Sequence, residues 1–113
     1  CPPCKAEMPD IQKLHESYDT EGEEALVVLG VAAPNMGGEG SEEEIAAFLE
    51  EQGYTYPVVM DTTGEIFSAY GISSFPTTFM IDRDGNVFGY VTGMLSEDVM
   101  KSIIKQTMEG KGE

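Results

Sequence analysis

The sequence predicts an α/β domain in which helices flank a central mixed β-sheet, and three patterns support this fold class. Residues 25–33 (ALVVLGVAA) are continuously apolar and rich in β-branched side chains, as in a strand that is covered on both faces. Residues 77–81 and 87–91 flank the turn sequence DRDGN and predict an antiparallel hairpin. Four segments have helical signatures, and these are 5–18, 41–53, 64–72 and 96–108. Helices and strands that alternate in this order indicate an α/β sandwich.

The N-terminal half has one helix and two strand patterns. Apolar residues recur every three or four positions over 8–18, and Pro9 should bend the helix that carries them. The apolar segment 25–33 is expected at or near the centre of the sheet. Residues 56–61 (YPVVMD) predict a further short strand.

Two other helices have sequence signals at their ends. Residues 41–44 (SEEE) form a capping box, and Gly53 is placed to end the helix that follows. The last helix begins at Ser96, and Leu95 is placed to pack against Met100. The expected core face of that helix consists of Val99, Met100, Ile103 and Ile104.

Length and charge limit the function classes. The chain has 113 residues, enough for one domain over 1–113, and 41% of them are hydrophobic, enough for one core. The formal net charge of −15 disfavours nucleic acids and anionic membrane surfaces as partners. No apolar run approaches the roughly 20 residues that a membrane span requires. Any export signal or anchor would lie upstream of Cys1, so we expect no localisation signal in the sequence itself.

The two cysteines lie in the sequence CPPC at residues 1–4, at the start of a predicted helix. A helix N-terminus offers unpaired N–H groups and the positive end of the helix dipole, which favour a thiolate. Cys1, on the outer side of the turn, is the expected nucleophile, and Cys4 is the expected resolving thiol. Pro2 and Pro3 suit the first helical positions, where a backbone N–H is not needed. The pattern predicts a redox-active dithiol.

Metal binding is the alternative that the same spacing leaves open. A zinc site needs four ligands, and the sequence offers Cys1, Cys4 and the lone His15, so a carboxylate or a second chain would have to complete it. We therefore keep a metal-binding or metal-chaperone module as the second hypothesis.

Two motifs resemble the thioredoxin superfamily. The sequence CPPCKAEMP (1–9) looks like its active-site helix, and GISSFPTTFMIDRDGNV (71–87) looks like its cis-proline loop and the hairpin that follows. The resemblance covers roughly residues 1–108 and is specifically to TlpA/ResA-type bacterial extracytoplasmic thiol-disulfide oxidoreductases, which have an AhpC/TSA- or redoxin-like domain. The sequence departs from that pattern in having no tryptophan.

The resemblance implies a thioredoxin fold and a protein-disulfide reductase that needs no cofactor. Its partners would be a disulfide-containing protein substrate and an upstream thiol electron donor, one bound to the membrane. Pro76 would be in cis beside the dithiol. Substrate would be bound by residues that surround these two features, namely Phe75, Pro76, Thr92, Gly93, Pro2 and Pro3.

Glu7 is the third candidate catalytic residue. It lies three positions after Cys4 and therefore on the same side of the helix. A glutamate in the first turns of a helix can also be a solvated residue that the dipole favours. The resemblance implies a buried carboxyl that exchanges a proton with Cys4, with its pKa raised by burial.

The same resemblance places a strand ahead of the dithiol helix, between the strands at 25–33 and 77–81. No residue of this sequence precedes Cys1 to form it. We expect either that the sequence is part of a longer protein or that another chain supplies the strand.

Overall fold

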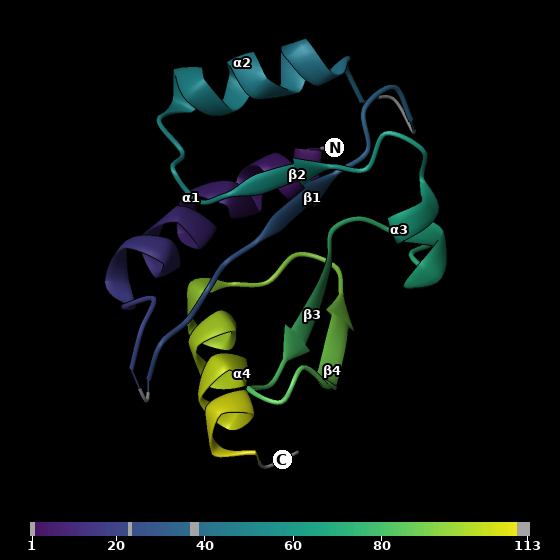
Figure 1. Cartoon of the computed structure of the whole chain (residues 1–113). Helices are drawn as coiled ribbons and strands as arrows, with labels where there is room; N and C mark the ends of the chain where they lie inside the picture. The colour runs from purple at the N-terminus through teal and green to yellow at the C-terminus, as the bar shows by residue number, and fades with distance from the viewer. Residues whose placement is uncertain (1, 23, 37–38, 111–113) are drawn as a thin grey trace.

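The computed structural model describes residues 2–22, 24–36 and 39–110. The described residues form four helices and four strands. Figure 1 shows their arrangement. In order, they are α1 (Pro2–Ser17), β1 (Gly30–Ala32), α2 (Glu42–Gln52), β2 (Val58–Met60), α3 (Glu65–Ala69), β3 (Thr77–Ile81), β4 (Val87–Thr92) and α4 (Glu97–Glu109). The expected sequence of elements is confirmed, and α1 is assigned as one helix with Pro9 inside it.

The strands form two small sheets rather than the one central sheet that we expected. β1 pairs with β2 in parallel, with Gly30 opposite Val58, and β3 pairs with β4 in antiparallel, with Thr77 opposite Thr92. Within the described residues no ladder joins β1 to β3. This is the arrangement expected where the strand position between 25–33 and 77–81 is unfilled.

The expectation that residues 25–33 form a central strand covered on both faces is wrong. Only Gly30–Ala32 are in a strand, and β1 has one neighbour. Side chains at every second position are exposed, with Val27 68% and Leu29 56% accessible. These side chains are exposed because no described element lies over that side of the segment. The apolar composition of a segment does not indicate which elements will cover it.

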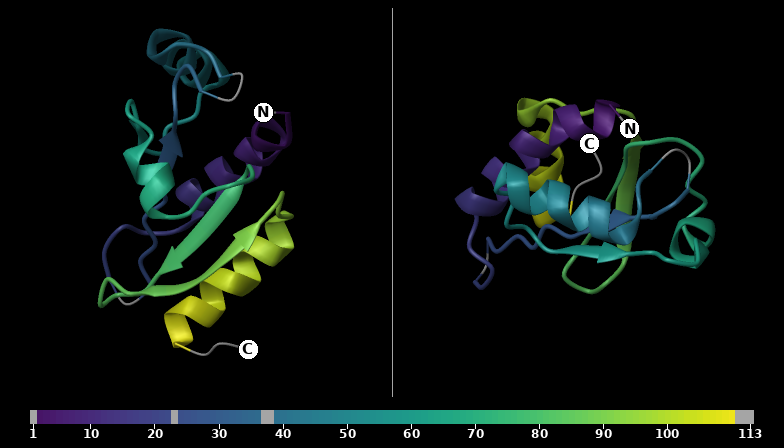
Figure 2. Two further views of the ribbon diagram at one scale, coloured as in Figure 1. Left: turned by 90° about the vertical axis from the view of Figure 1, so that its right-hand side faces the viewer. Right: turned by 90° about the horizontal axis from the view of Figure 1, so that it is seen from above.

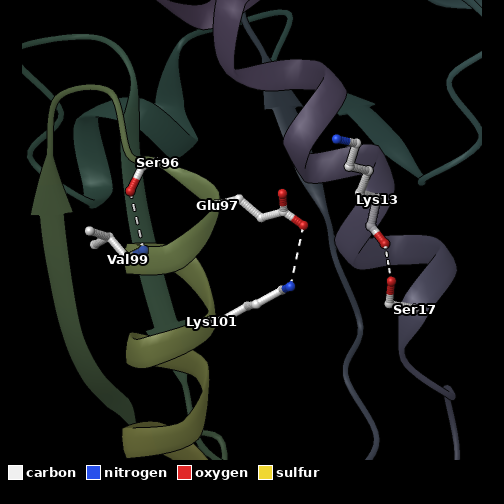
Figure 3. A network of polar contacts seen from close by, with 6 residues as sticks. All are labelled: Lys13, Ser17, Ser96, Glu97, Val99 and Lys101. Carbon is white, nitrogen blue, oxygen red and sulfur yellow. Dashed lines mark hydrogen bonds and ion pairs between the residues drawn. The ribbon is translucent and has the colours of Figure 1, made fainter.

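The helix ends follow their sequence signals. Ser41 accepts a hydrogen bond from the Glu44 N–H and Glu44 accepts one from the Ser41 N–H, so the capping box is confirmed, and Gly53 ends α2 in the left-handed region with φ 78°. Ser96 caps α4 by accepting from the Val99 N–H (Figure 3). Each of these contacts joins residues three positions apart, which makes it readable from sequence.

The buried core cluster joins α1, the helix that carries the dithiol, to α4. Leu14, Leu95 and Met100 are buried together, with Ile103 and Ile104 packed against them. Leu95 and Met100 were expected to pack together, and this is confirmed, whereas Val99 is exposed because it lies off the face that meets α1. The left view in Figure 2 shows α4 running along the β3–β4 hairpin.

Asp61 holds the start of α3 in place and leads to a stability prediction. Its buried carboxylate accepts from the Gly64 N–H at 3.1 Å and from the Phe67 N–H at 2.9 Å. In Asp61→Asn one of the two acceptor atoms becomes an amide donor, so one buried N–H loses its partner. We expect the free energy of unfolding to fall by about 1–3 kcal/mol in chemical denaturation. An unchanged midpoint would show that water replaces the carboxylate without cost.

Candidate active site

The first turn of α1 carries the CPPC sequence. Cys4 is partly buried and disulfide-bonded, while Cys1 lies outside the described residues. Pro2 and Pro3 are the first two residues of the helix, where a backbone N–H is not needed. Both are exposed. The structure therefore places a disulfide sulfur at the N-terminus of a 16-residue helix, next to exposed prolines.

Four of the six residues expected to bind substrate, Phe75, Pro76, Thr92 and Gly93, lie together at the start of β3, whereas Pro2 and Pro3 lie in α1. The Phe75–Pro76 peptide bond is cis, and the Pro76 carbonyl accepts from the Gly93 N–H at 2.8 Å. Thr92 pairs with Thr77 in the β3–β4 ladder. Phe75 packs on Phe67 with ring centroids 5.5 Å apart and remains 50% exposed. An apolar surface next to a fixed backbone segment is available there to a bound chain.

Glu7 connects α1 to the segment that follows β4. Its side chain is 3% exposed, and its Oε2 accepts from the Leu95 N–H at 2.9 Å. Burial raises the pKa of Glu7, because water no longer solvates the carboxylate; the Leu95 hydrogen bond opposes this and the charge of Asp10 adds to it. Glu7 is therefore a buried acid rather than a solvated residue of the helix start.

Tyr56, which directly precedes Pro57 and β2, is a neighbour of Glu7 that the sequence did not indicate. It is 7% exposed, and its ring lies 6.0 Å from that of Tyr54 and 6.4 Å from that of His15, centroid to centroid. Burial, followed by the charges of Tyr54 and Glu7, raises the pKa of Tyr56 to about 12. The phenol stays neutral throughout the pH range in which thiols titrate.

A cavity of about 310 Å³ lies between α1, α2 and the β1–β2 sheet, and Cys4 is on its wall. Lys5 lies over the ring of Phe48 on α2, with Nζ 4.9 Å from the centroid, so a cation bridges the two helices beside the cavity. The remaining lining is largely apolar and includes Met8, Val31, Ile45, Leu49, Tyr56 and Val58.

His15 is a ring neighbour of Tyr56. In the part of the chain that the structure describes, no group of three or more His, Cys, Asp or Glu side chains is placed to hold a metal ion. No helix among the described residues is long and apolar enough to cross a membrane.

The sequence patterns indicated Cys4, Glu7 and the residues around Pro76 as candidates, but they indicated neither Tyr56 nor the partners of Glu7. The Leu95 N–H donates to Glu7 from 88 residues further along the chain, and the charge of Glu7 acts on the Tyr56 phenol, which is 49 residues away along the chain. No local pattern marks such contacts, because only the packing of α1 against the rest of the fold creates them.

The raised pKa of Tyr56 leads to a prediction for alkaline stability. Because the phenol ionises at about 12 in the fold and near 10.0 when exposed, ionisation favours the unfolded chain above pH 10. The contribution of Tyr56 to the free energy of unfolding is thus complete below pH 10 and is lost as pH rises toward 12. Denaturant unfolding at pH 9 and 11.5 should show that the free energy of unfolding falls less between these two pH values in Tyr56→Phe than in the parent. Equal losses would contradict the assigned burial of the hydroxyl.

Comparisons with known proteins show the family of the chain. The Redoxin family model matches residues 1–107. The ResA thiol-disulfide oxidoreductase of Geobacillus thermodenitrificans is 36% identical over 101 residues, which are 89% of this chain and 53% of the relative. That of Bacillus subtilis is 32% identical over 113 residues, covering 98% of this chain and 58% of the relative. The chain thus spans little more than half the length of these relatives.

Solved structures give the same fold. The exposed lipoprotein thioredoxin Etrx1 of Streptococcus pneumoniae superposes with a TM-score of 0.80 at 28% identity, covering 94% of this chain and 76% of that one. A thiol:disulfide interchange protein of the thioredoxin family from Chlorobium tepidum has a TM-score of 0.77 at 30% identity, with 96% and 72% covered. The chain therefore has a thioredoxin-like fold and belongs to the Redoxin family of the thioredoxin superfamily, among ResA/TlpA-like proteins.

Proposed function

We propose that the protein is a thiol-disulfide oxidoreductase that reduces protein disulfides through the couple Cys1/Cys4. The observation that carries the proposal is the disulfide-bonded Cys4 in the first turn of a helix that Glu7 ties to the segment after β4. The family resemblance of nearly the whole chain and the names of its ResA relatives support it. Residues 1–113 act as one domain in this proposal.

The reaction begins with the dithiol form. The Cys1 thiolate attacks one sulfur of the substrate disulfide, a mixed disulfide forms, and the other substrate sulfur leaves as a thiolate that takes up a proton. The Cys4 sulfur then attacks Cys1, which releases the second substrate thiol and leaves Cys1 and Cys4 joined. Two electrons pass to the substrate, and an upstream dithiol must return two electrons and two protons to the enzyme.

Glu7 is proposed as the proton acceptor for Cys4. It lies one helical turn from Cys4, is buried, and has a raised pKa because of that burial. A carboxyl with these properties takes the proton of Cys4 as this thiol attacks, and returns it when the couple is reduced. Its hydrogen bond with Leu95 holds the carboxylate at a fixed place next to α1.

Substrate is proposed to bind as an extended chain next to Pro76. The exposed Phe75, the cis bond to Pro76 and the hydrogen-bonded Gly93 form one side of this groove, with Thr92 at its edge. The exposed Pro2 and Pro3, next to Cys4 at the start of α1, are proposed to contact the substrate from the side of the dithiol. The partners are a protein substrate with an accessible disulfide and a thiol donor, which we propose to be membrane-bound.

An extracytoplasmic location is also proposed. It is supported by the names of the relatives, which include an exposed lipoprotein thioredoxin. The protein would then work in a compartment where substrate disulfides form and persist.

An insulin-reduction assay with a dithiol donor tests the proposed function, with metal analysis of the same reduced preparation. We expect insulin disulfides to be reduced by metal-free protein. A stoichiometric metal that blocks alkylation of both cysteines, with no reduction of insulin, would favour the metal-binding hypothesis, which finds no support in the relatives described above.

A further inference from the structure

We propose that Glu7 has a second and separable role as a positioning residue, in which its carboxylate fixes the substrate groove by holding the segment Gly93–Leu95 against the dithiol helix. The inference rests on the proposed function for the meaning of the groove. The tie itself is a property of the structure and can be tested without any assay of activity.

Two hydrogen bonds form a continuous connection from the dithiol helix to the cis-proline loop. Glu7 Oε2 accepts from the Leu95 N–H at 2.9 Å, and the Pro76 carbonyl accepts from the Gly93 N–H at 2.8 Å. Leu95 and Gly93 are separated only by Met94. A displacement of Glu7 is therefore passed through three residues of backbone to Pro76.

The hydrogen bond between Glu7 and Leu95 is strong enough to hold the Leu95 backbone in place. A backbone N–H that donates to a buried carboxylate forms a charge-assisted hydrogen bond, which is stronger than a neutral one. Glu7 is almost completely buried, so water does not readily replace either group when the bond is lost. The Leu95 N–H would then be left without its acceptor, and the backbone around it would move to find another.

The side chain of Leu95 does not by itself fix this segment. It packs with Leu14 and Met100 and so anchors its own position in the core. Met94, which precedes it, is 54% exposed, and its backbone is held on either side by the two hydrogen bonds. The Gly93 N–H joins this segment to Pro76, and the bond to Glu7 is the backbone hydrogen bond that joins the same segment to α1, in addition to the packing of Leu95.

Glutamine and methionine at position 7 separate the two roles. Glu7→Gln keeps an oxygen that can accept from Leu95 but removes the acid. Glu7→Met has a similar length and removes both. If Glu7 positions the groove, both variants lose the same proton-transfer contribution, and only Glu7→Met loses the geometry that binds an extended substrate.

The experiment compares both variants with the parent in insulin reduction and in amide hydrogen exchange of the full chain. We expect kcat to fall equally in both variants, and KM for insulin to be about tenfold higher in Glu7→Met than in Glu7→Gln. KM for a small disulfide, 5,5′-dithiobis(2-nitrobenzoate), should be the same in both. The Leu95 amide should exchange about tenfold faster in Glu7→Met than in Glu7→Gln.

Equal KM values for insulin in the two variants, or equal protection of the Leu95 amide, would overturn the proposal. Glu7→Asp provides a second test if the methionine variant does not fold, because it keeps the charge but withdraws the carboxylate by one methylene. It too should raise KM and expose the Leu95 amide, and an unchanged amide would count against the tie. If the parent reduces no insulin, the proposed function fails, while amide exchange still decides whether Glu7 holds Leu95.

Discussion

Cys1→Ser is expected to abolish the attack on substrate disulfides, whereas Cys4→Ser is expected to accumulate mixed disulfides between Cys1 and substrate. The reason is the different placement of the two thiols. In the sequence Cys1 directly precedes the exposed Pro2 and Pro3, and Cys4 follows them, partly buried on the cavity wall. Without Cys4 no second thiol is in reach to release the substrate.

The measurement is non-reducing electrophoresis and mass spectrometry after incubation with a protein disulfide. Insulin turnover should fall by at least about 10³-fold in Cys1→Ser, because the activated nucleophile is lost. Adducts should be abundant only in Cys4→Ser. Abundant adducts on the Cys1→Ser variant would reverse the assignment of nucleophile and resolving thiol.

Glu7→Gln is expected to slow the resolution of the mixed disulfide by about 10²-fold at neutral pH, the lower end of what a positioned acid or base contributes. It should also move the alkylation profile of Cys4 to lower pH. Above its own pKa, Glu7 carries a negative charge that disfavours the Cys4 thiolate, and the neutral amide removes this charge. Single-turnover kinetics and iodoacetamide alkylation from pH 5 to 9 measure the two effects.

The fold should remain intact in this variant. The folded-state pKa of Glu7 is raised, so its contribution to stability is complete below the ordinary pKa of 4.5 and is lost as pH rises through the raised value. Glu7→Gln at pH 7 should therefore unfold at no lower temperature than the parent. Glu51→Gln on the exposed side of α2 is the matched control for charge, and resolution kinetics like those of the parent in both variants would contradict the role of Glu7.

Local signals made the helices predictable. The capping box at Ser41 and the cap at Ser96 depend on contacts within three residues, and the hairpin of β3 and β4 depends on the turn between them. The CPPC sequence is also a local pattern, and its role as a redox dithiol stays a prediction. These features depend on residues that lie close together in the sequence.

Contacts across the fold were not predictable in the same way. The split into two sheets and the exposure of Val27 and Leu29 depend on which elements lie beside 25–33, whereas its composition suggested a covered strand. The burial of Glu7 was suggested by family resemblance, but its partner Leu95 was not, because 88 residues separate them. Such contacts follow from tertiary packing, which single-sequence patterns do not encode.

The reduction potential of the Cys1/Cys4 couple tests the central proposal most directly. The protein would be equilibrated in glutathione buffers of increasing reducing strength and quenched with an alkylating agent. Mass spectrometry then gives the fractions of the disulfide form and of the reduced, alkylated form. We predict one two-electron transition that involves both cysteines, at a potential more negative than about −200 mV, as suits a reductase. A couple with no such transition, or one with the strongly oxidising value of about −120 mV, would contradict a disulfide reductase.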